Sequence, residues 1–462
     1  MKSRRAISVV SALLLLAAGG LAALYLSSRR DVTTSSAAAY EAYRQGIENE
    51  HRVYLKEARV AYARALELDP DFAMAMLGLA RSAEHDQAMS LVERARRRRD
   101  RLNENERLHV DLQFAGVNGK RDEFLKLARA IHEKYPDDIR AALILCEDEL
   151  GKGNSERALA IFADVLAVDP NNALAYNLIG YFYGYRGDYD KAIENLKKYQ
   201  FMAPDQANPY DSLGEIQAYS GHYDEAVASL NRALGIKPDF FDSYGHLGVA
   251  YEGKGDYAKA IQNYVKAAQF AVSDGRRRDF LFQALRVAAE SKDVASAREI
   301  SGRLEATRKD KYSEVRKAAC RAVVDLVEGR PAQAEASLRE VRPTLESLFQ
   351  KEAKDSGLKF YEPGWNHLMA WAKVAQGKDD EAIALYEEMA NPPNPWRKFE
   401  DRRDVYEGRA NLAALLAKKG GLDRAEKLLE ENRKWNPSWA PTRQAELTVA
   451  QLRREKVLAA AK

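Results

Sequence analysis

The chain has 462 residues, of which 72 are basic and 69 acidic, giving a formal net charge of +3. This near balance provides no long-range field for collecting nucleic acid or an acidic substrate. The two cysteines, Cys146 and Cys320, are far apart and each lies in an apolar helical pattern, so we expect buried thiols rather than a disulfide or a metal site.

The first 30 residues differ from all that follow. An uncharged run from Ala6 to Leu26 comes after three basic residues and before two more. As a helix this run reaches about 31 Å, enough to cross a bilayer core. The apolar part of a cleavable signal peptide is usually only about 7–15 residues long, so we predict an uncleaved membrane anchor, with a cleaved signal as the alternative. The larger number of basic residues before the run places the short N-terminus in the cytoplasm and the rest outside.

Residues 173–274 consist of three successive segments of 34 residues that superimpose. Tyrosine recurs at the fourth and seventeenth positions, glycine at the eighth and fifteenth, alanine at the twentieth and a large residue at the twenty-fourth. These residues are Tyr176, Tyr210 and Tyr244; Tyr189, Tyr223 and Tyr257; Gly180, Gly214 and Gly248; Gly187, Gly221 and Gly255; Ala192, Ala226 and Ala260; and Leu196, Leu230 and Tyr264. A fixed period of this size is typical of a repeat architecture.

Each segment holds two helix-length stretches separated by a glycine. Gly187 can end the first helix and Asp188 can cap the second. Glycine at the eighth position and alanine at the twentieth let the two helices approach closely, while Pro204 and Pro238 end the second helix of their copies. One such pair cannot bury its apolar face alone, so the pairs must stack.

This pattern resembles the tetratricopeptide repeat. The resemblance implies an all-α, right-handed superhelical solenoid, which here would contain about eleven helix pairs. We assign residues 1–30 to the membrane anchor or uncleaved signal, 31–38 to a linker, 39–274 to repeats in good register, 275–439 to degenerate helical repeats, and 440–462 to a capping helix. The stretch from "DPDFAMAMLGLA" through "ENERLHVDLQFAGVNGKRDEF" looks like the repeat domains attached to bacterial membrane-bound kinases and regulators, although no kinase motif is present.

We expect no catalytic residues, no cofactor and no metal. The stretch "GVAYEGK", from Gly248 to Lys254, has the skeleton of a phosphate-binding loop, but Gly255 stands where a hydroxyl residue is needed and both glycines belong to the repeat. The basic run from Arg94 to Arg101 is interpreted as a solvated helix end, where cations complement the helix dipole. A contact with an anion or an anionic lipid is the alternative.

In the tetratricopeptide family the first helix of each copy lines the concave face. The resemblance therefore places a partner-binding groove at Asn177, Tyr181, Tyr185, Asp211, Glu215, Tyr219 and Asp242. The lysines and arginines with which some members clamp a peptide carboxylate are absent. The groove is acidic and aromatic, so we expect its carboxylates on the surface of adjacent copies, where they would bind a basic peptide. The alternative is that these are ordinary solvated helix faces.

Together these features predict a non-enzymatic scaffold or adaptor that binds proteins or peptides, anchored by residues 6–26 in a bacterial inner membrane with its solenoid facing the periplasm or the outside. The bacterial source rests on the resemblance alone. A periplasmic or secreted protein would result if the signal were cleaved. A ligand-sensing domain that signals through the membrane helix is the second hypothesis, and an enzyme of unrecognised type is the third. The sequence leaves the oligomeric state open.

Overall fold

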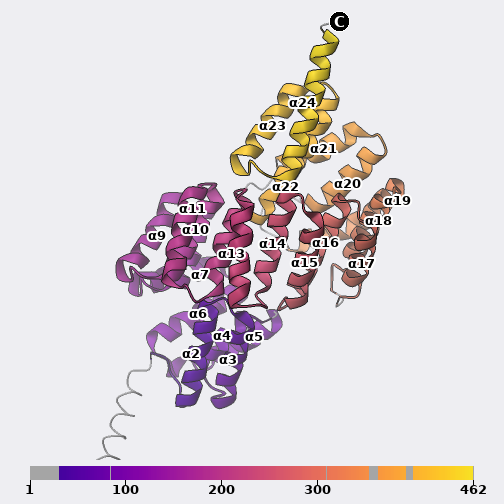
Figure 1. The fold of residues 1–462 in the computed structure, drawn as a ribbon. Coiled ribbons are helices and arrows are strands. Elements are labelled where there is room, and N and C mark those ends of the chain that lie inside the picture. The colour runs from indigo at the N-terminus through magenta and orange to yellow at the C-terminus, as the bar shows by residue number, and fades with distance from the viewer. Residues whose placement is uncertain (1–30, 84, 308–309, 353–362, 392–398, 461–462) are drawn as a thin grey trace, which may run out of the picture. The chain divides into compact units, whose positions relative to one another are not determined.

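The computed structural model describes residues 31–83, 85–307, 310–352, 363–391 and 399–460. In these residues the regular structure is helical throughout, with α-helices α2–α24 and one short 3₁₀ turn, η1. Helices α2 to α23 follow one another as eleven pairs, and α24 comes last as a single helix (Figure 1). The all-α array of about eleven helix pairs is therefore confirmed, whereas its right-handed twist stays a prediction.

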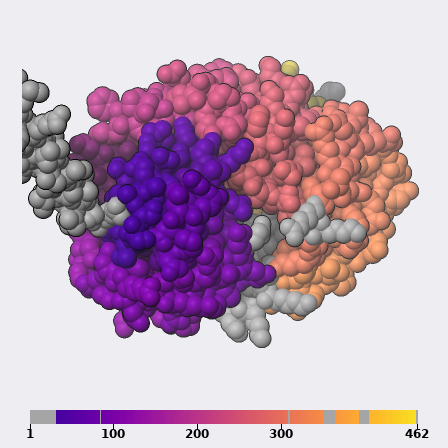
Figure 2. Space-filling model, turned by 90° about the horizontal axis from the view of Figure 1, so that it is seen from below, coloured from indigo at the N-terminus to yellow at the C-terminus, as the bar shows by residue number. Residues whose placement is uncertain are grey.

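The chain divides into two compact units, residues 1–172 and 173–462. The described part of the first unit contains α2 (Ala37–His51), α3 (Leu55–Leu68), α4 (Ala73–Ala80), α5 (His85–Arg96), η1 (Arg99–Arg101), α6 (Glu104–Val117), α7 (Arg121–Lys134), α8 (Ile139–Gly151) and α9 (Ser155–Val168). Figure 2 shows these helices, indigo to purple, packed into a continuous surface.

The second unit contains the three repeats in register and the degenerate repeats that follow them. Its helices are α10 (Ala173–Arg186), α11 (Tyr189–Met202), α12 (Ala207–Tyr219), α13 (Tyr223–Ile236), α14 (Phe241–Lys254), α15 (Tyr257–Phe270), α16 (Asp274–Glu290), α17 (Val294–Glu305), α18 (Ser313–Val327), α19 (Pro331–Glu352), α20 (Pro363–Ala375), α21 (Asp379–Ala390), α22 (Phe399–Lys418), α23 (Leu422–Trp435) and α24 (Ala440–Ala460).

None of the helices in the described ranges is both long and apolar enough to span a bilayer. The predicted anchor, residues 6–26, lies outside those ranges, so its membrane insertion stays a prediction.

The two helices of each pair meet at the small residues that define the repeat. A Cβ atom built on Gly180 would lie 2.6 Å from Cγ of Leu196, and one on Gly214 would lie 2.6 Å from Cγ of Leu230. Ala226 is completely buried at the same contact. Because these distances are far inside van der Waals contact, only glycine lets α10 pack on α11, and α12 on α13, at this separation.

The turn inside each pair follows the predicted chemistry. Gly187, Gly221 and Gly255 have φ of 78°, 86° and 82°, in the left-handed region that favours glycine. Asp188 then accepts a hydrogen bond from the backbone N–H of Lys191 and caps α11. The predicted helix end and helix start are both present.

Residues 31–36 at the start of the first unit pack against its repeats. Val32 is buried. The hydroxyl of Thr33 donates to Oε2 of Glu106 at 2.6 Å, and the hydroxyl of Thr34 donates to Oδ2 of Asp69 at 2.6 Å. The stretch predicted as a linker is thus held by buried carboxylates over most of its length.

The two cysteines, the "GVAYEGK" stretch and the basic run all contribute to the packing of the fold. Both cysteines are free and buried, as predicted. The "GVAYEGK" stretch lies inside α14, where Gly248 faces the ring of Tyr264, so it forms no phosphate loop. The basic run lies at the end of α5 and in η1, where Arg98 pairs with Asp71 and Arg99 lies 2.9 Å from Asp111. The interpretation as a helix end is therefore favoured over an anion site.

Candidate partner-binding site on helices α10, α12 and α14

The first helices of successive pairs in the second unit contact one another, as α10 does with α12 and α12 with α14. Contacts between successive second helices, such as α11 and α13, are far sparser. The stack therefore curves with its first helices on the inside. All seven predicted groove residues lie on these inner helices: Asn177, Tyr181 and Tyr185 on α10; Asp211, Glu215 and Tyr219 on α12; and Asp242 on α14.

Two of the carboxylates share one histidine. Nδ1 of His246 lies 3.1 Å from Oδ1 of Asp211, and its Nε2 lies 3.6 Å from Oε1 of Glu215. Burial alone would lower the pKa of His246, but the two carboxylates outweigh burial and raise it to about 10. At neutral pH His246 is therefore an imidazolium that donates a proton toward each carboxylate. The hydroxyl of Ser243 donates a further bond of 2.6 Å to Asp211.

Tyr181 joins the same group from the preceding helix. Its hydroxyl donates a 2.5 Å hydrogen bond to Oε2 of Glu215. Burial, and then the charge of Glu215, raise the pKa of this tyrosine well above its usual value. The phenol thus stays neutral and acts as a hydrogen-bond donor to Glu215.

Asp242 lies one helical turn before His246 and completes the group. Burial, followed by repulsion from Asp211, raises its pKa to about 7, although His246 and Arg276 act in the opposite direction. In the described part of the chain no hydrogen bond or ion pair engages its carboxyl group. His246 is thus the one basic side chain in this group of four, against three carboxyl groups. We call Asp211, Glu215, Asp242 and His246 the acidic cluster.

The remaining predicted groove residues differ in their exposure and in their contacts. Tyr185 is 39 % exposed, and its ring centre lies 6.1 Å from that of Tyr181. Asn177 is buried, and its side-chain oxygen has no hydrogen-bond partner among the described residues. Tyr219 packs against the hydrophobic core that contains Tyr223.

The carboxylates are less exposed than the sequence suggested. We expected solvent-facing side chains, yet Asp211 keeps 4 % and Glu215 9 % of its side-chain surface exposed. The reason is the close contact of successive inner helices, which brings Ser243 and His246 of one copy against the carboxylates of the copy before. The expectation of a freely solvated groove is wrong for these two residues.

Three family models match parts of this chain. Models described as tetratricopeptide repeat match residues 161–194 and 241–271, and one described as TPR repeat matches residues 214–255. The chain therefore contains tetratricopeptide repeats. The likeness to repeat domains of bacterial membrane-bound kinases stays a prediction.

Comparison with curated proteins gave no match for this repeat protein. Among solved structures it is similar to the Cut9 and Hcn1 hetero-tetramer of the APC/C, at 15 % identity over 90 % of this chain and 76 % of that chain, with a TM-score of 0.45. It is similar to MamA, at 23 % identity over 34 % and 93 %, with a TM-score of 0.29. It is also similar to a tetratricopeptide repeat protein from Parabacteroides merdae, at 14 % identity over 58 % and 96 %, with a TM-score of 0.40. At these scores the similarities carry no conclusion about function.

Sequence reasoning missed the cation at the centre of the repeat protein's acidic cluster. His246 falls outside the groove positions expected for the family, but it lies four residues after Asp242, on the same helix face. This spacing of one helical turn is the signal in the sequence that indicates His246. Sequence reasoning also did not point to Arg286, which follows Glu252 by one period of 34 residues.

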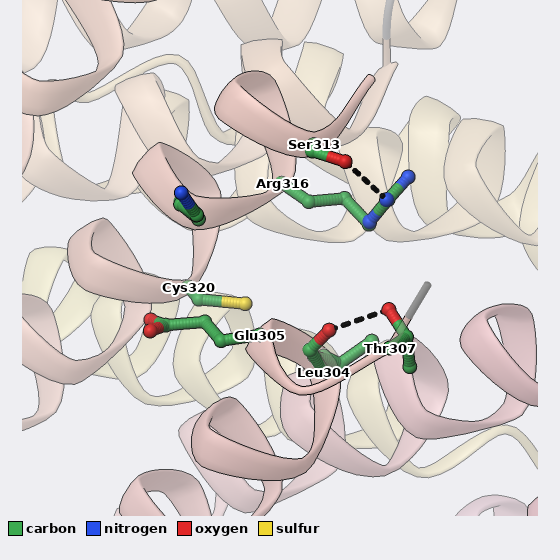
Figure 3. A pocket seen from close by; sticks show the side chains of 7 residues that line it. Leu304, Glu305, Thr307, Ser313, Arg316 and Cys320 are labelled. Carbon is green, nitrogen blue, oxygen red and sulfur yellow. Dashed lines mark hydrogen bonds between the residues drawn. The ribbon is translucent and has the colours of Figure 1, made fainter. Parts of the chain in front are cut away.

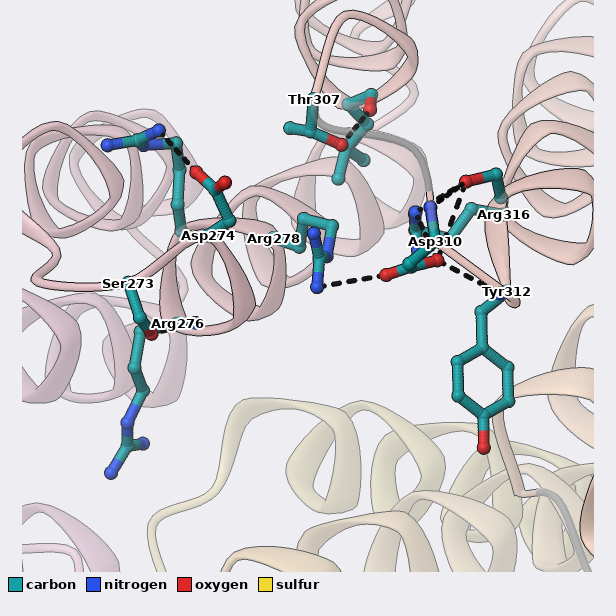
Figure 4. A network of polar contacts seen from close by, with 11 residues as sticks. Ser273, Asp274, Arg276, Arg278, Thr307, Asp310, Tyr312 and Arg316 are labelled. Carbon is teal, nitrogen blue, oxygen red and sulfur yellow. Dashed lines mark hydrogen bonds and ion pairs between the residues drawn. The ribbon is translucent and has the colours of Figure 1, made fainter. Parts of the chain in front are cut away.

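Basic residues follow the acidic cluster on the next pair of inner helices. Figure 4 shows Arg278 of α16 and Arg316 of α18 reaching the same carboxylate, Asp310, at 3.0 Å and 2.9 Å. Arg276 of α16 is exposed, and its side chain points away from this network in Figure 4. At the start of α16 the exposed basic residue Arg276 thus follows the acidic cluster, while Arg278 is paired with Asp310.

A small pocket lies beside Arg316, and the one thiol that lines it is unreactive. Leu304, Thr307, Arg316 and Cys320 are among the residues that line it (Figure 3). Burial raises the pKa of the Cys320 thiol to about 11, so it is not a nucleophile at neutral pH. In the described residues there is also no group of histidine, cysteine and carboxylate side chains placed to hold a metal ion.

Proposed function

We propose that this repeat protein is a non-enzymatic scaffold and that its acidic cluster binds a lysine or arginine side chain of a partner protein or peptide. Tetratricopeptide repeats suggest protein–protein interaction as the general role. The observation that supports the basic partner is Asp242, a carboxyl group beside two other carboxylates that has no ion-pair partner of its own in the described residues. An incoming cation would supply that partner.

Asp242 also links binding to pH. In the free protein its pKa is about 7. A bound cation favours the ionised form, so binding releases a proton wherever Asp242 is protonated beforehand. Affinity for a basic ligand is therefore expected to fall as the pH drops below about 7.

Tyr185 supports the same ligand from the side. Its ring is the exposed aromatic surface next to Tyr181. An aromatic face attracts a lysine or arginine head group, and the ring can also pack against the aliphatic stem of such a side chain. Tyr185 would thus contact the partner chain on α10, beside Tyr181, while a basic side chain of that partner reaches Asp242 on α14.

The test is the affinity of the full chain for lysine- and arginine-containing peptides, measured by fluorescence anisotropy at pH 6 and pH 8. Asp242→Asn keeps the shape of the side chain and removes its charge, so binding should weaken roughly ten- to a hundredfold at pH 8 and lose its pH dependence. Asp190→Asn, at an exposed position of the outer helix α11, is the matched control. Equal affinity of the two variants for every basic peptide bound by the wild type would refute the proposal.

We also propose that residues 6–26 anchor the scaffold in a bacterial inner membrane with its repeats outside the cytoplasm. This proposal is supported by the length of the apolar run and the basic residues before it. Cleavage after the run would instead release the same scaffold into the periplasm.

A further inference from the structure

The connector between α23 and α24 lies across the turns of the first three repeats in the second unit. It comprises residues 435–440, "WNPSWA", which we call the clasp. We infer that the clasp is a detachable lock that holds the C-terminal helices against these repeats, and that its release uncovers charged residues on the inner face of α14 and α16. This inference is independent of the proposed basic partner.

The contacts of the clasp follow the repeat. A Cβ atom on Gly187, in the turn of the first copy, would lie 2.5 Å from the ring of Trp435. One on Gly221, in the second turn, would lie 2.8 Å from Oδ1 of Asn436, and one on Gly255, in the third, 3.9 Å from Cβ of Ala440. One short segment thus meets three successive left-handed turns in order. The missing side chains at two of these turns leave the space that it occupies.

A buried side chain recognises the middle turn specifically. Oδ1 of Asn436 accepts a hydrogen bond of 3.1 Å from the hydroxyl of Tyr223, a residue 213 positions earlier in the chain. The amide of Asn436 faces the carbonyl oxygen of Ala218 at 3.5 Å. Asn436 and Tyr223 are 6 % and 7 % exposed. Burial raises the pKa of Tyr223 above its ordinary value, so its hydroxyl remains a donor.

One buried polar group of the clasp has no hydrogen-bond partner among the described residues. Trp439 is 5 % exposed and packs in the core that contains Tyr223 and Ala250. Its indole N–H is buried and has no acceptor among the described residues. If the clasp opened, water would accept a hydrogen bond from this N–H. The new bond would offset part of the free energy that is lost when the other contacts of the clasp break.

The helices after α20 have buried cores of their own, whereas α20 itself also packs in the core of the preceding repeats through Leu368, Met369 and Ala372. Helices α22, α23 and α24 share one hydrophobic cluster, which includes Leu429 and Val449. Helices α20, α21 and α22 share another, which includes Tyr386 and Leu412. Trp439 is the one described residue after α20 that belongs to the fully buried part of the core of the preceding repeats. The clasp is therefore the main apolar contact between these helices and the first copies.

While the clasp is in place, a second contact joins the C-terminal helices to the inner face of α16. Arg286 of α16 pairs with Glu252 of α14 at 2.6 Å, and these residues hold the same inner position in successive copies. Glu407 of α22 approaches Arg286 at 3.8 Å, and His367 of α20 lies 3.5 Å from Glu407. Side chains of α20 and α22 thus lie against Arg286 on the inner face of α16.

The lock can be tested with two glycine variants of the full chain. Gly187→Ala adds a methyl group against Trp435, whereas Gly377→Ala creates the same left-handed strain at φ of 73° with no atom within 4 Å. Hydrogen exchange followed by mass spectrometry should show amides 436–443 exchanging roughly three- to tenfold faster in Gly187→Ala than in Gly377→Ala. Equal exchange in the two variants would overturn the inference.

A milder pair of variants guards against unfolding. Tyr223→Phe removes the hydroxyl that Asn436 accepts from, and Tyr210→Phe removes a comparable bond to the carbonyl of Pro204. Only Tyr223→Phe should speed exchange at the clasp while leaving exchange within α22 and α23 unchanged. Faster exchange throughout the unit would mean that the clasp is part of one inseparable core.

Distance measurements distinguish release of the clasp within one chain from an exchange of C-terminal helices between two chains. Spin labels at Glu225→Cys on α13 and Leu447→Cys on α24, both at exposed positions, should give one distance in the wild type and a second, longer one with Tyr223→Phe. The longer distance should not depend on protein concentration. If the distance distribution changes with protein concentration and dimers form in solution, the clasp instead exchanges between two copies of the chain. That result would contradict an internal lock.

Discussion

The hydroxyl of Tyr181 donates a 2.5 Å hydrogen bond to Glu215, the residue at the same position of the next repeat. Glu252 and Arg286, also one period apart, form a 2.6 Å ion pair on the next two copies. The period of the sequence is thus also the spacing of polar contacts along the inner face. Because each bond joins neighbouring copies, these contacts fix the register of the stack as well as the chemistry of its surface.

The first prediction concerns the stability cost of Asp242. Its pKa in the folded protein, about 7, lies above its ordinary value of 3.8, so between these pH values the folded state binds more protons than the unfolded state. The contribution of Asp242 to stability therefore falls as the pH rises from about 4 to 7. Asp242→Asn should stabilise the second unit by about 1–3 kcal/mol at pH 8 and change little at pH 4.

Urea unfolding of wild type and variant at pH 4, 6 and 8 measures this difference. Asp190→Asn should show no comparable gain, because its carboxylate is exposed. If Asp242→Asn is less stable than wild type at pH 8, the carboxyl group has a favourable partner that this structure does not contain.

His246 provides the second prediction. Its pKa is raised from 6.5 to about 10, so its stabilisation is fully present below about 6.5 and is lost as the pH rises toward 10. His246→Ala leaves Asp211 and Glu215 buried without their cation, which should cost about 3–5 kcal/mol at neutral pH. Circular dichroism during urea unfolding measures the loss, and His222→Ala, at an exposed position of the α12–α13 turn, is the control.

The same burial changes what charge reversal should do. Replacing Asp211 and Glu215 with lysine would be a mild surface change if they faced solvent, but the structure buries both beside His246. The double variant should therefore unfold at a clearly lower temperature than wild type. An unchanged melting curve would place the two carboxylates back at the surface.

The sequence predicts most clearly the contacts within one repeat, because the period of 34 residues determines them. Gly180 against Leu196, and the left-handed turn at Gly187, follow from local spacing and backbone chemistry. The contact of Tyr223 with Asn436 could not be predicted, because the partners lie 213 residues apart and only the accumulated curvature of several pairs brings them together. The burial of Asp211 was missed for a related reason, since it depends on how closely successive inner helices pack.

The third prediction tests the packing inside one pair. Ala226 is completely buried, and its carbonyl oxygen lies 3.2 Å from the position of a Cβ atom on Gly214. Ala226→Leu should overpack α12 against α13 and cost about 1–3 kcal/mol. The loss should appear first as faster hydrogen exchange in α12 and α13, because repeats mainly contact their neighbours. A variant that melts as the wild type does would contradict the packing of this pair.

The fourth prediction concerns the N-terminal segment. The run from Ala6 to Leu26 is long enough to span a bilayer core, and three basic residues precede it against two that follow. A reporter that is active only outside the cytoplasm should therefore be active when fused after Lys462. The protein should also stay with the membrane fraction after a high-salt wash, which removes proteins held by charge alone. A mature N-terminus near residue 28 would show signal cleavage instead. Recovery of the full-length chain in the soluble fraction would exclude the anchor, and an inactive reporter on a membrane-bound chain would reverse the orientation.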